Sequence, residues 1–241
     1  MQYIIADIHG CFLEYKLLLE KLNLTDNDSV YILGDCIDRG EEPIKVVKDI
    51  MNRSNFTYIL GNHEWMMLTA IRPLMQEITN QSINSLEIND NLYLAFGDWI
   101  NNGGETTLQQ FLALEQWEQE DMMCFLEECQ AYETIEHEGK LYVLVHAGLG
   151  NFSLNKELDE YSVVDFIWGR TDYKKQYFPN GKIFLVTGHT PVQLIREDKQ
   201  PIIYTKNNHI GIDCGCVFGG KLAAYCIETG EAVYVDAVKT V

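Results

Sequence analysis

Residues Val30–Gly40 read VYILGDCIDRG, and this stretch decides the expected fold. An apolar run typical of a buried strand stops at Gly34, and Asp35, Asp38 and Arg39 follow it closely. Burying charge costs free energy, so charged side chains crowded at the end of a buried strand indicate a binding site. In open α/β sheets, ligands bind at the carboxyl ends of the strands, which is where these residues lie.

Four further apolar strands end in Asp, His or Asn beside glycine. These are Tyr3–Ala6 before Asp7-Ile8-His9-Gly10, Tyr58–Leu60 before Gly61-Asn62-His63-Glu64, Leu141–Val145 before His146-Ala147-Gly148, and Phe184–Val186 before Thr187-Gly188-His189-Thr190. Four of the six histidines therefore occupy matching positions. A lone buried histidine is more often a hydrogen-bonded core residue, but core packing hardly explains four. His137 and His209 match no such motif, and no role is assigned to them.

The order of elements predicts an α/β protein with a parallel sheet. Helices expected at Glu14–Leu22 and Pro43–Met51 alternate with the first three strands in a βαβαβ rhythm. From about Met66 to Gln130 that rhythm fails, and we expect a mostly helical cap, including helices at Trp65–Leu74 and Thr107–Ala131. Strands return after Gly139, and one domain over residues 1–241 with a helical insertion at about 66–130 is expected. The last expected strands are Ile210–Ile212 and a hairpin of Leu222–Ile227 with Ala232–Val235.

Composition limits the classes of partner. The chain has 241 residues, and its 18 basic and 36 acidic side chains give a formal net charge of −18. This charge argues against a nucleic-acid partner, because phosphate backbones are bound by clustered Lys and Arg. No apolar run approaches the roughly 20 residues that a membrane helix needs, and no secretion signal is evident. We therefore expect a cytoplasmic protein with no membrane partner, in which all seven cysteines are reduced thiols.

The side chains at the strand ends suit divalent cations. Imidazole together with carboxylate and amide oxygen favours manganese, iron or zinc, whereas magnesium and calcium prefer shells of oxygen alone. Seven such side chains are too many for one tetrahedral site. They suit two ions about 3.5–4 Å apart that share a bridging carboxylate, an arrangement found in many phosphatases.

The blocks DIHG, GDCIDRG, GNHE, HAG and GHT occur in this order between Asp7 and Thr190. The series resembles the phosphoprotein phosphatase family of calcineurin-like metallophosphoesterases, in particular bacterial and phage serine/threonine phosphatases. The resemblance implies an α/β metallophosphoesterase fold, a central β-sandwich of mixed sheets flanked by helices. It also implies two divalent ions, most often manganese, with iron or zinc as alternatives. The ligands it implies are Asp7, His9 and Asp35 for one ion, and Asp35, Asn62, His146 and His189 for the other.

The same resemblance assigns catalytic roles. His63 would protonate the leaving oxygen, and Asp38 would hold its ring; the alternative for Asp38 is a surface ion pair. Arg39 and Arg170 would bind the phosphoryl oxygens together with Asn62, although Arg170 could instead be a surface charge beside a packed Trp168. The implied reaction is direct attack on phosphorus by a hydroxide that bridges the metals.

The substrate stays open at this level. A phosphomonoesterase acting on phosphoserine or phosphothreonine proteins is the first expectation, with a phosphoprotein or small phosphoester as partner. The segment Ile212–Leu222 is also reminiscent of symmetrical diadenosine tetraphosphate hydrolases, and a catalytically silent metal-binding module is a third alternative. Asn101–Thr107 resembles a segment that lies near the cleft in bacterial members. Cys11 and Cys36, which follow two of the blocks, could be oxidation-sensitive thiols or small buried residues that fill space.

Overall fold

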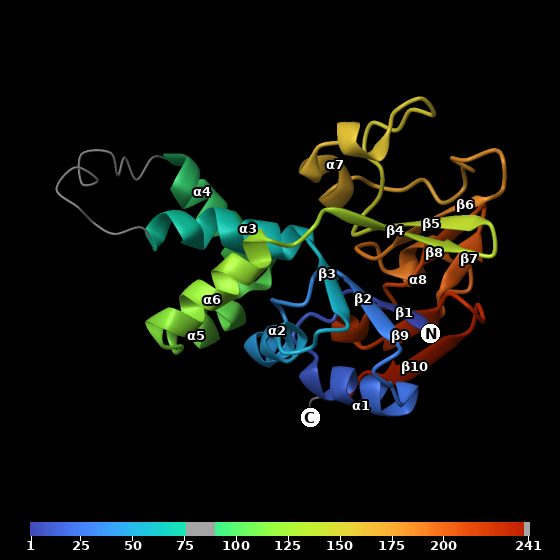
Figure 1. Ribbon diagram of the computed structural model, residues 1–241. Helices are drawn as coiled ribbons and strands as arrows, with labels where there is room; N and C mark the ends of the chain where they lie inside the picture. The colour runs from blue at the N-terminus through green and yellow to red at the C-terminus, as the bar shows by residue number, and fades with distance from the viewer. Residues whose placement is uncertain (76–89, 239–241) are drawn as a thin grey trace.

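The computed structural model describes residues 1–75 and 90–238, and in this part of the chain ten strands form two five-stranded mixed sheets (Figure 1). The first sheet has the order β10-β9-β1-β2-β3 and the second the order β4-β5-β6-β8-β7. The strands are β1 (Gln2–Ile5), β2 (Ser29–Leu33), β3 (Phe56–Ile59), β4 (Tyr132–His137), β5 (Lys140–Val145), β6 (Ile183–Thr187), β7 (Tyr204–Lys206), β8 (His209–Gly211), β9 (Lys221–Cys226) and β10 (Ala232–Asp236).

Helices flank both sheets and occupy most of the segment between β3 and β4. The α-helices are α1 (Phe12–Leu22), α2 (Pro43–Met51), α3 (Asn62–Ile71), α4 (Asp90–Trp99), α5 (Glu105–Leu112), α6 (Gln116–Glu127), α7 (Val163–Ile167) and α8 (Val192–Ile195). Short 3₁₀ turns are η1 (Arg72–Leu74), η3 (Leu158–Glu160) and η4 (Cys216–Phe218), and a π-type turn, η2 (Ile100–Gly104), joins α4 to α5.

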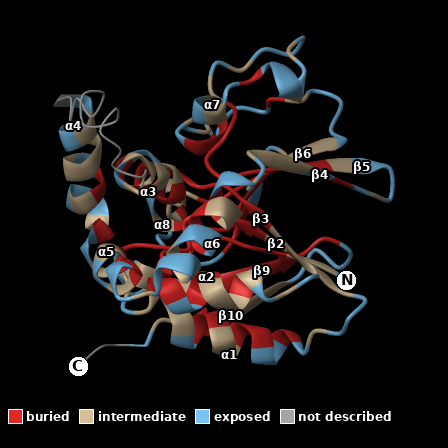
Figure 2. Cartoon of the chain, turned by 60° about the vertical axis from the view of Figure 1, so that its left-hand side comes forward, coloured by how far each residue is buried: buried red, intermediate tan, exposed pale blue. Residues whose placement is uncertain are grey.

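Three hydrophobic clusters build a layered sandwich. Successive strand residues point to opposite faces, so Ile4 packs between the two sheets whereas Ile5 packs under the helices of the first sheet. A third cluster, which includes Val145 and Phe166, covers the outer face of the second sheet beneath α7. Figure 2 shows the resulting buried strands between partly exposed helices. Because the central strands are buried on both faces, they read as continuous apolar runs in the sequence.

The expected α/β metallophosphoesterase architecture of two mixed sheets flanked by helices is confirmed. Strands β1, β2 and β3 pair in parallel, and β9 and β10 form the expected antiparallel hairpin with Tyr225 opposite Ala232. Strands β4 and β7 were not expected. β4 reads YETIEH and buries only Ile135, and β7 spans only Tyr204–Lys206, so neither gives an apolar run.

The expectation of one helix over Thr107–Ala131 is wrong in its continuity. Helix α5 ends at Leu112, and Glu115 begins α6 with a capping box in which the Glu118 carboxylate accepts the Glu115 N–H at 3.1 Å. This reciprocal cap favours a new helix start over continuation of the old helix. Helix α4 was also not foreseen, and residues 76–89 of the expected helical cap lie outside the described residues.

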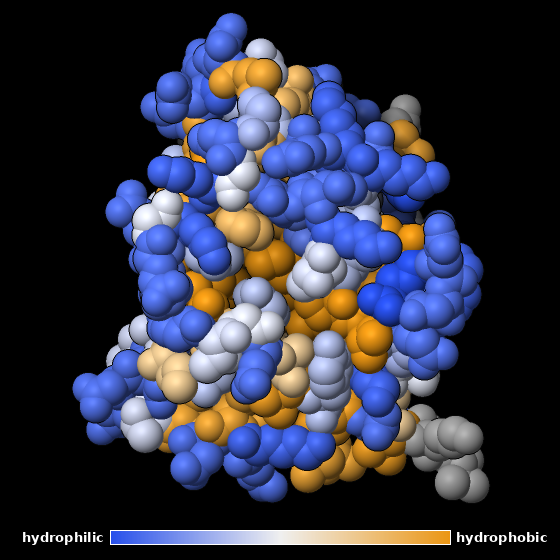
Figure 3. All heavy atoms as spheres, turned by 90° about the vertical axis from the view of Figure 1, so that its right-hand side faces the viewer, coloured by the Kyte–Doolittle hydropathy of each residue, from blue (hydrophilic) through white to orange (hydrophobic). Residues whose placement is uncertain are grey.

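Hydrophilic side chains cover much of the face shown in Figure 3, and hydrophobic ones gather in the hollows between them. Among the described residues, no helix combines the length and apolar character required to cross a bilayer. The sandwich places the carboxyl ends of β1, β2, β3, β5 and β6 at one edge, where the motif residues meet.

Candidate active site

The motif residues converge from five loops, and the backbone there is unusual. Positive φ angles between 45° and 69° occur at a set of site residues that are not glycine: Asp7, His9, Asp35, Asp38, Arg39 and His189. A non-glycine residue in this region costs about 1 kcal/mol or more, so such strain concentrates where function requires a special geometry. Six strained residues at one edge indicate a site that the surrounding fold holds in place.

Asp35 lies at the centre of the site. Its Oδ2 is 3.6 Å from His9 Nε2, 3.4 Å from His146 Nε2 and 3.9 Å from His63 Nε2. Asp35 belongs to two groups of side chains whose ligand atoms lie within 4.8 Å of one another, one with His9 and His63 and the other with His146 and His189. Burial opposes ionisation of Asp35, but nearby His146 and His63 hold its pKa well below the usual range. The carboxylate therefore lies where a bridging ligand would.

Backbone carbonyls fix which histidine nitrogens face the site. His9 Nδ1 bonds the Ile37 carbonyl at 2.8 Å, and His146 Nδ1 bonds the Leu33 carbonyl at 2.6 Å. A carbonyl accepts only an N–H, so in each ring Nδ1 is the protonated nitrogen and Nε2 is the one that faces the site and, in the neutral ring, carries the lone pair. Burial, opposed by the charge of Asp35, lowers the pKa of His9 to about 3, which keeps this imidazole neutral and able to bind a metal.

The second group is rich in lone pairs. His146 Nε2 is 2.9 Å from Asn62 Oδ1 and 3.2 Å from His189 Nδ1, and the last two atoms are 2.9 Å apart. Burial alone would lower the pKa of His146, but Asp35 raises it to about 10, so Nε2 holds a proton that a divalent cation would displace on binding. Burial and the charge of His146 lower the pKa of His189 to about 3. The donor set therefore fits a divalent cation of the kind bound by imidazole and oxygen ligands.

Asp7 is placed differently from the other expected ligands. Both of its carboxylate oxygens lie 2.9 Å from the His189 backbone N–H and accept from it, and Asp7 belongs to neither of the two close groups described above. Burial and the charge of Asp213 raise the pKa of Asp7 well above its usual range. Gly188 allows this approach, because a Cβ there would lie 2.0 Å from Asp7 Oδ2. Asp7 thus joins the β1 loop to the β6 loop at the edge of the site.

His63 and Asp38 form a buried pair, as expected. His63 Nδ1 is 2.6 Å from Asp38 Oδ2, and neither residue exposes more than 1% of its surface. Two residues of the helical segment also donate to the Asp38 carboxylate: Trp99 Nε1 at 2.9 Å and Thr107 Oγ1 at 2.6 Å. The alternative of a surface ion pair for Asp38 is excluded by its complete burial. Neither Trp99 nor Thr107 was assigned a role from the sequence, although Thr107 ends the Asn101–Thr107 segment that was expected near the cleft and Trp99 lies two residues before it.

Glu64 is a second residue that sequence reasoning left without a role. Its fully buried carboxylate accepts the N–H groups of Asp35 at 2.8 Å, Cys36 at 2.9 Å and Gly61 at 3.1 Å. These bonds tie the β2 loop to the start of α3 and fix the backbone of Asp35. Glu64 lies at the third position of a helix, from which a Glu carboxylate commonly accepts the N–H of the residue before the helix, and this position could have identified it.

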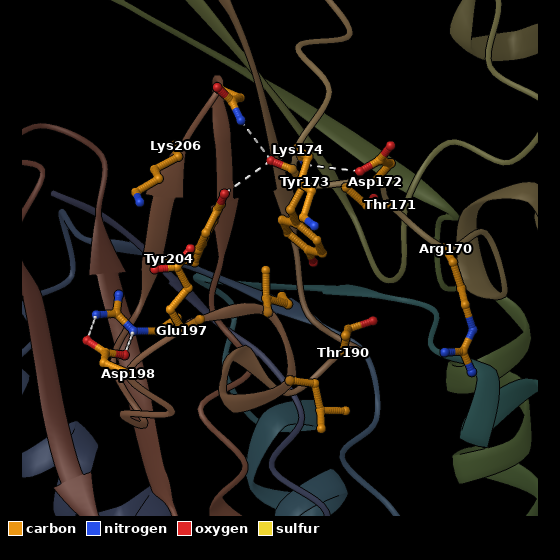
Figure 4. Close-up of a pocket in the computed structure, with 14 residues that line it drawn as sticks. Arg170, Thr171, Asp172, Tyr173, Lys174, Thr190, Glu197, Asp198, Tyr204 and Lys206 are labelled. Atoms are coloured by element: carbon orange, nitrogen blue, oxygen red, sulfur yellow. Dashed lines mark hydrogen bonds and ion pairs between the residues drawn. The ribbon is translucent and has the colours of Figure 1, made fainter.

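The two expected phosphate-binding arginines have different surroundings. Arg39 is held in place: its backbone N–H donates to the Gly103 carbonyl at 3.0 Å, Nη1 lies 2.6 Å from His9 Nε2, and its guanidinium lies 5.4 Å from the Phe218 ring centre. Arg170 is exposed, and its charge contributes to the lowered pKa of His189. It stands at the border of an adjacent pocket (Figure 4).

All seven cysteines are free thiols, as expected. Burial and the charge of Glu64 raise the pKa of the Cys36 thiol well above its usual range, which favours a space-filling role for Cys36 over a reactive one. Cys11 is half-buried and lies near Glu14 and Cys216. His209 bonds the Lys175 carbonyl at 2.7 Å and packs on Tyr177, which is a structural position.

The comparisons with known proteins agree with this geometry. The chain belongs to the calcineurin-like phosphoesterase family, whose sequence model matches residues 3–224. It is 30% identical over 262 residues to the asymmetrical bis(5'-nucleosyl)-tetraphosphatase PrpE of Geobacillus sp. (strain WCH70), covering 97% of this chain and 93% of that protein. The PrpE of Bacillus subtilis (strain 168) is 27% identical, with the same coverage of both chains. The chain is therefore a metallophosphoesterase.

Solved structures share its fold. The crystal structure of a putative diadenosine tetraphosphatase matches with a TM-score of 0.63 at 19% identity and covers 99% of this chain and 94% of that one. A serine/threonine phosphatase of Saccharomyces cerevisiae matches with a TM-score of 0.57 at 14% identity and covers 100% of this chain and 80% of that one. At these identities the likeness concerns the fold.

Proposed function

We propose that this metallophosphoesterase hydrolyses dinucleoside tetraphosphates asymmetrically, into a nucleoside monophosphate and a nucleoside triphosphate. The observation that carries the proposal is the similarity, along 97% of the chain, to proteins named asymmetrical bis(5'-nucleosyl)-tetraphosphatases. From the sequence, a protein serine/threonine phosphatase is the first expectation and a symmetrical dinucleotide hydrolase the second. The relatives favour the dinucleotide as substrate, with the asymmetrical cut.

We also propose the site residues. Asp7, His9 and Asp35 would hold one divalent ion, and Asp35, Asn62, His146 and His189 the other. The lone pairs of His9 Nε2, His146 Nε2 and Asn62 Oδ1, which all face the site, support this assignment. When bound, such ions polarise phosphoryl oxygens and make a nucleophile available at neutral pH. Manganese is the expected metal, because mixed nitrogen and oxygen ligands accept it readily.

The chain's own side chains would carry out the remaining steps. Arg39 and Arg170 would donate hydrogen bonds to the phosphoryl oxygens, and the Asn62 amide would contact them as well. His63 would donate its Nε2 proton to the oxygen of the departing nucleotide, while Asp38 accepts the Nδ1–H and holds the ring in position for this transfer. Trp99 and Thr107 support this role, because their hydrogen bonds fix the Asp38 carboxylate. We further propose that residues 1–241 form one domain and that the helical segment at 66–130 is its cap.

The decisive experiment compares three substrates with the manganese-loaded protein. We expect kcat/KM for diadenosine tetraphosphate to exceed that for a phosphoserine peptide and for a simple aryl phosphate. Chromatography of the products should show AMP and ATP in equal amounts, whereas two ADP would indicate the symmetrical cut. Faster hydrolysis of the phosphopeptide would instead support the protein phosphatase. The His63→Gln variant, assayed in parallel, controls for a contaminating hydrolase.

A further inference from the structure

An elongated pocket of about 830 Å³ begins beside the candidate active site and extends along the second sheet. Arg170 and Thr190 lie at one end, and Thr190 directly follows His189. Tyr204 and Lys206 of β7 lie at the other end (Figure 4). The pocket therefore leads away from the place where a phosphoryl group would bind, toward the outer strand of the sheet.

The charges around this pocket are unusual for so acidic a protein. Its lining contains four basic and three acidic side chains: Arg170, Lys174, Arg196 and Lys206 against Asp172, Glu197 and Asp198. The whole chain, in contrast, carries a net charge of −18. Arg196 is neutralised by Asp198, whose oxygens lie 2.8 and 2.6 Å from Nε and Nη2. Lys174 and Lys206 form no ion pair with any described residue, so both remain available to a ligand.

A second pocket, on the Arg39 side of the site, provides a comparison. It measures about 510 Å³, and its charged side chains are Arg39, Glu14, Glu41 and Glu42. Glu42 is ion-paired with Lys45, which leaves two carboxylates against one arginine in this pocket. The Arg170 pocket keeps three basic and two acidic side chains when the Arg196–Asp198 pair is set aside, so it has an excess of positive charge. Electrostatics therefore favours the Arg170 pocket for a polyphosphate.

The Arg170 pocket also offers apolar surface. Leu194 lines it with 71% of its surface exposed, and Ile195 follows next to it. The ring of Tyr204 is held by an edge contact with Tyr173 at 5.4 Å and by a hydrogen bond from its hydroxyl to the Tyr173 carbonyl at 3.1 Å. Tyr204 is only 8% exposed and forms the floor of the pocket, so the exposed Leu194 is the apolar surface against which a flat, partly apolar base can pack.

We propose that this pocket binds the nucleoside and outer phosphates of a dinucleoside polyphosphate while the reacting phosphate lies between Arg39 and Arg170. Lys174 and Lys206 contact the outer phosphates, and Leu194 contacts the base. The inference rests on the proposed function and adds to it where the rest of the substrate binds. This part, the nucleoside and phosphates beyond the reacting phosphate, is called the arm below.

The test reverses one charge at a time. In the manganese-loaded protein, Lys174→Glu and Lys206→Glu should each raise KM for diadenosine tetraphosphate about tenfold, the size of one charge-assisted hydrogen bond, with kcat little changed. Kinetic constants for a simple aryl phosphate, which has no arm to bind, should not change. Lys182→Glu is the matched control, because it alters the net charge equally but lies just before β6, at the end of that strand remote from His189.

Three outcomes are distinguishable. A rise in KM for the dinucleotide alone, absent in Lys182→Glu, supports the pocket as the arm site. Unchanged KM in both lysine variants, or equal changes for the dinucleotide and the aryl phosphate, overturns it while the proposed function stands. A wild-type protein with no activity on diadenosine tetraphosphate overturns the proposed function and this inference together. Leu194→Asp should likewise affect the dinucleotide only.

Discussion

The two sheets contribute to the candidate site in different ways. Loops of the first sheet supply the central Asp35 and the Asp38–His63 pair, and a buried network holds them. Glu64 fixes the Asp35 backbone, while Trp99 and Thr107 fix the Asp38 carboxylate. The site residues of the first sheet are therefore positioned by side chains that have no other evident role.

The second sheet supplies imidazoles and little else to the cluster. His146 is oriented by the Leu33 carbonyl, and the His189 N–H is bound by Asp7, so both depend on groups from the first sheet. In the proposed mechanism the first sheet would therefore hold the reactive groups, whereas the second sheet completes the histidine cluster and borders the Arg170 pocket. Substitutions in the first-sheet loops should therefore affect chemistry, and those in the second-sheet pocket should affect substrate preference.

The largest expected effect belongs to Asp35, because both ligand groups share it. Asp35→Asn should remove most bound manganese and lower kcat/KM by at least about 1,000-fold, since several kcal/mol of transition-state stabilisation depend on the metals. His189→Gln, on the second sheet, should weaken one ion and leave the other. Elemental analysis of the purified variants measures this difference directly. Equal metal loss in both variants would contradict the proposed difference between the contributions of the two sheets.

The second effect separates proton donation from metal binding. His63→Gln should lower kcat for diadenosine tetraphosphate by about 100-fold, within the range contributed by a general acid. The manganese content should stay at the wild-type level. The loss should be smaller for a nitrophenyl phosphate, whose leaving group departs without a proton. If manganese is lost together with activity, His63 belongs to the metal ligands. Its ring lies close enough to His9 and Asp35 to share an ion with them.

The sequence predicted the site residues at the strand ends well, but it did not predict the buried hydrogen bonds that hold these residues in place. Strands β1, β2, β3, β5 and β6 are buried on both faces, so each gave an apolar run ending in a legible motif. The histidines of the candidate site were recognisable because four of the six occupy equivalent positions at strand ends. Strand β4 was missed because it contains two glutamates and buries only Ile135, so it carries no apolar run.

The supporting residues could not be found in the same way. Trp99 lies 61 residues from Asp38 in the sequence, within a segment of turn signals, and nothing local distinguishes it from a core tryptophan. Glu64 could be read from its helix-start position, but its bonds to Asp35 and Cys36 depend on how β2 and α3 pack. Arg170 and its pocket depend on the relative placement of β6, α8 and β7, and the short β7 was not predicted. Contacts between distant segments are set by tertiary packing, which a local pattern does not encode.

The smallest of these effects tests whether the helical segment acts on catalysis through Asp38. Trp99→Phe keeps a large buried ring but removes the Nε1 donor, leaving Asp38 Oδ2 with His63 alone. Losing one such hydrogen bond costs about 1 kcal/mol, which should lower kcat for the dinucleotide roughly fivefold with KM unchanged. The limb of the pH–rate profile that reports the general acid should also shift. Trp117→Phe, at a tryptophan that is 66% exposed on α6, is the matched control and should change neither quantity. The thermal unfolding temperature separates an effect on catalysis through Asp38 from a simple loss of packing. A lower kcat with an unchanged pH profile and an unfolding temperature that falls in parallel would make Trp99 a packing residue, and the distinction between the sheets would then rest on Asp35, Glu64 and His63.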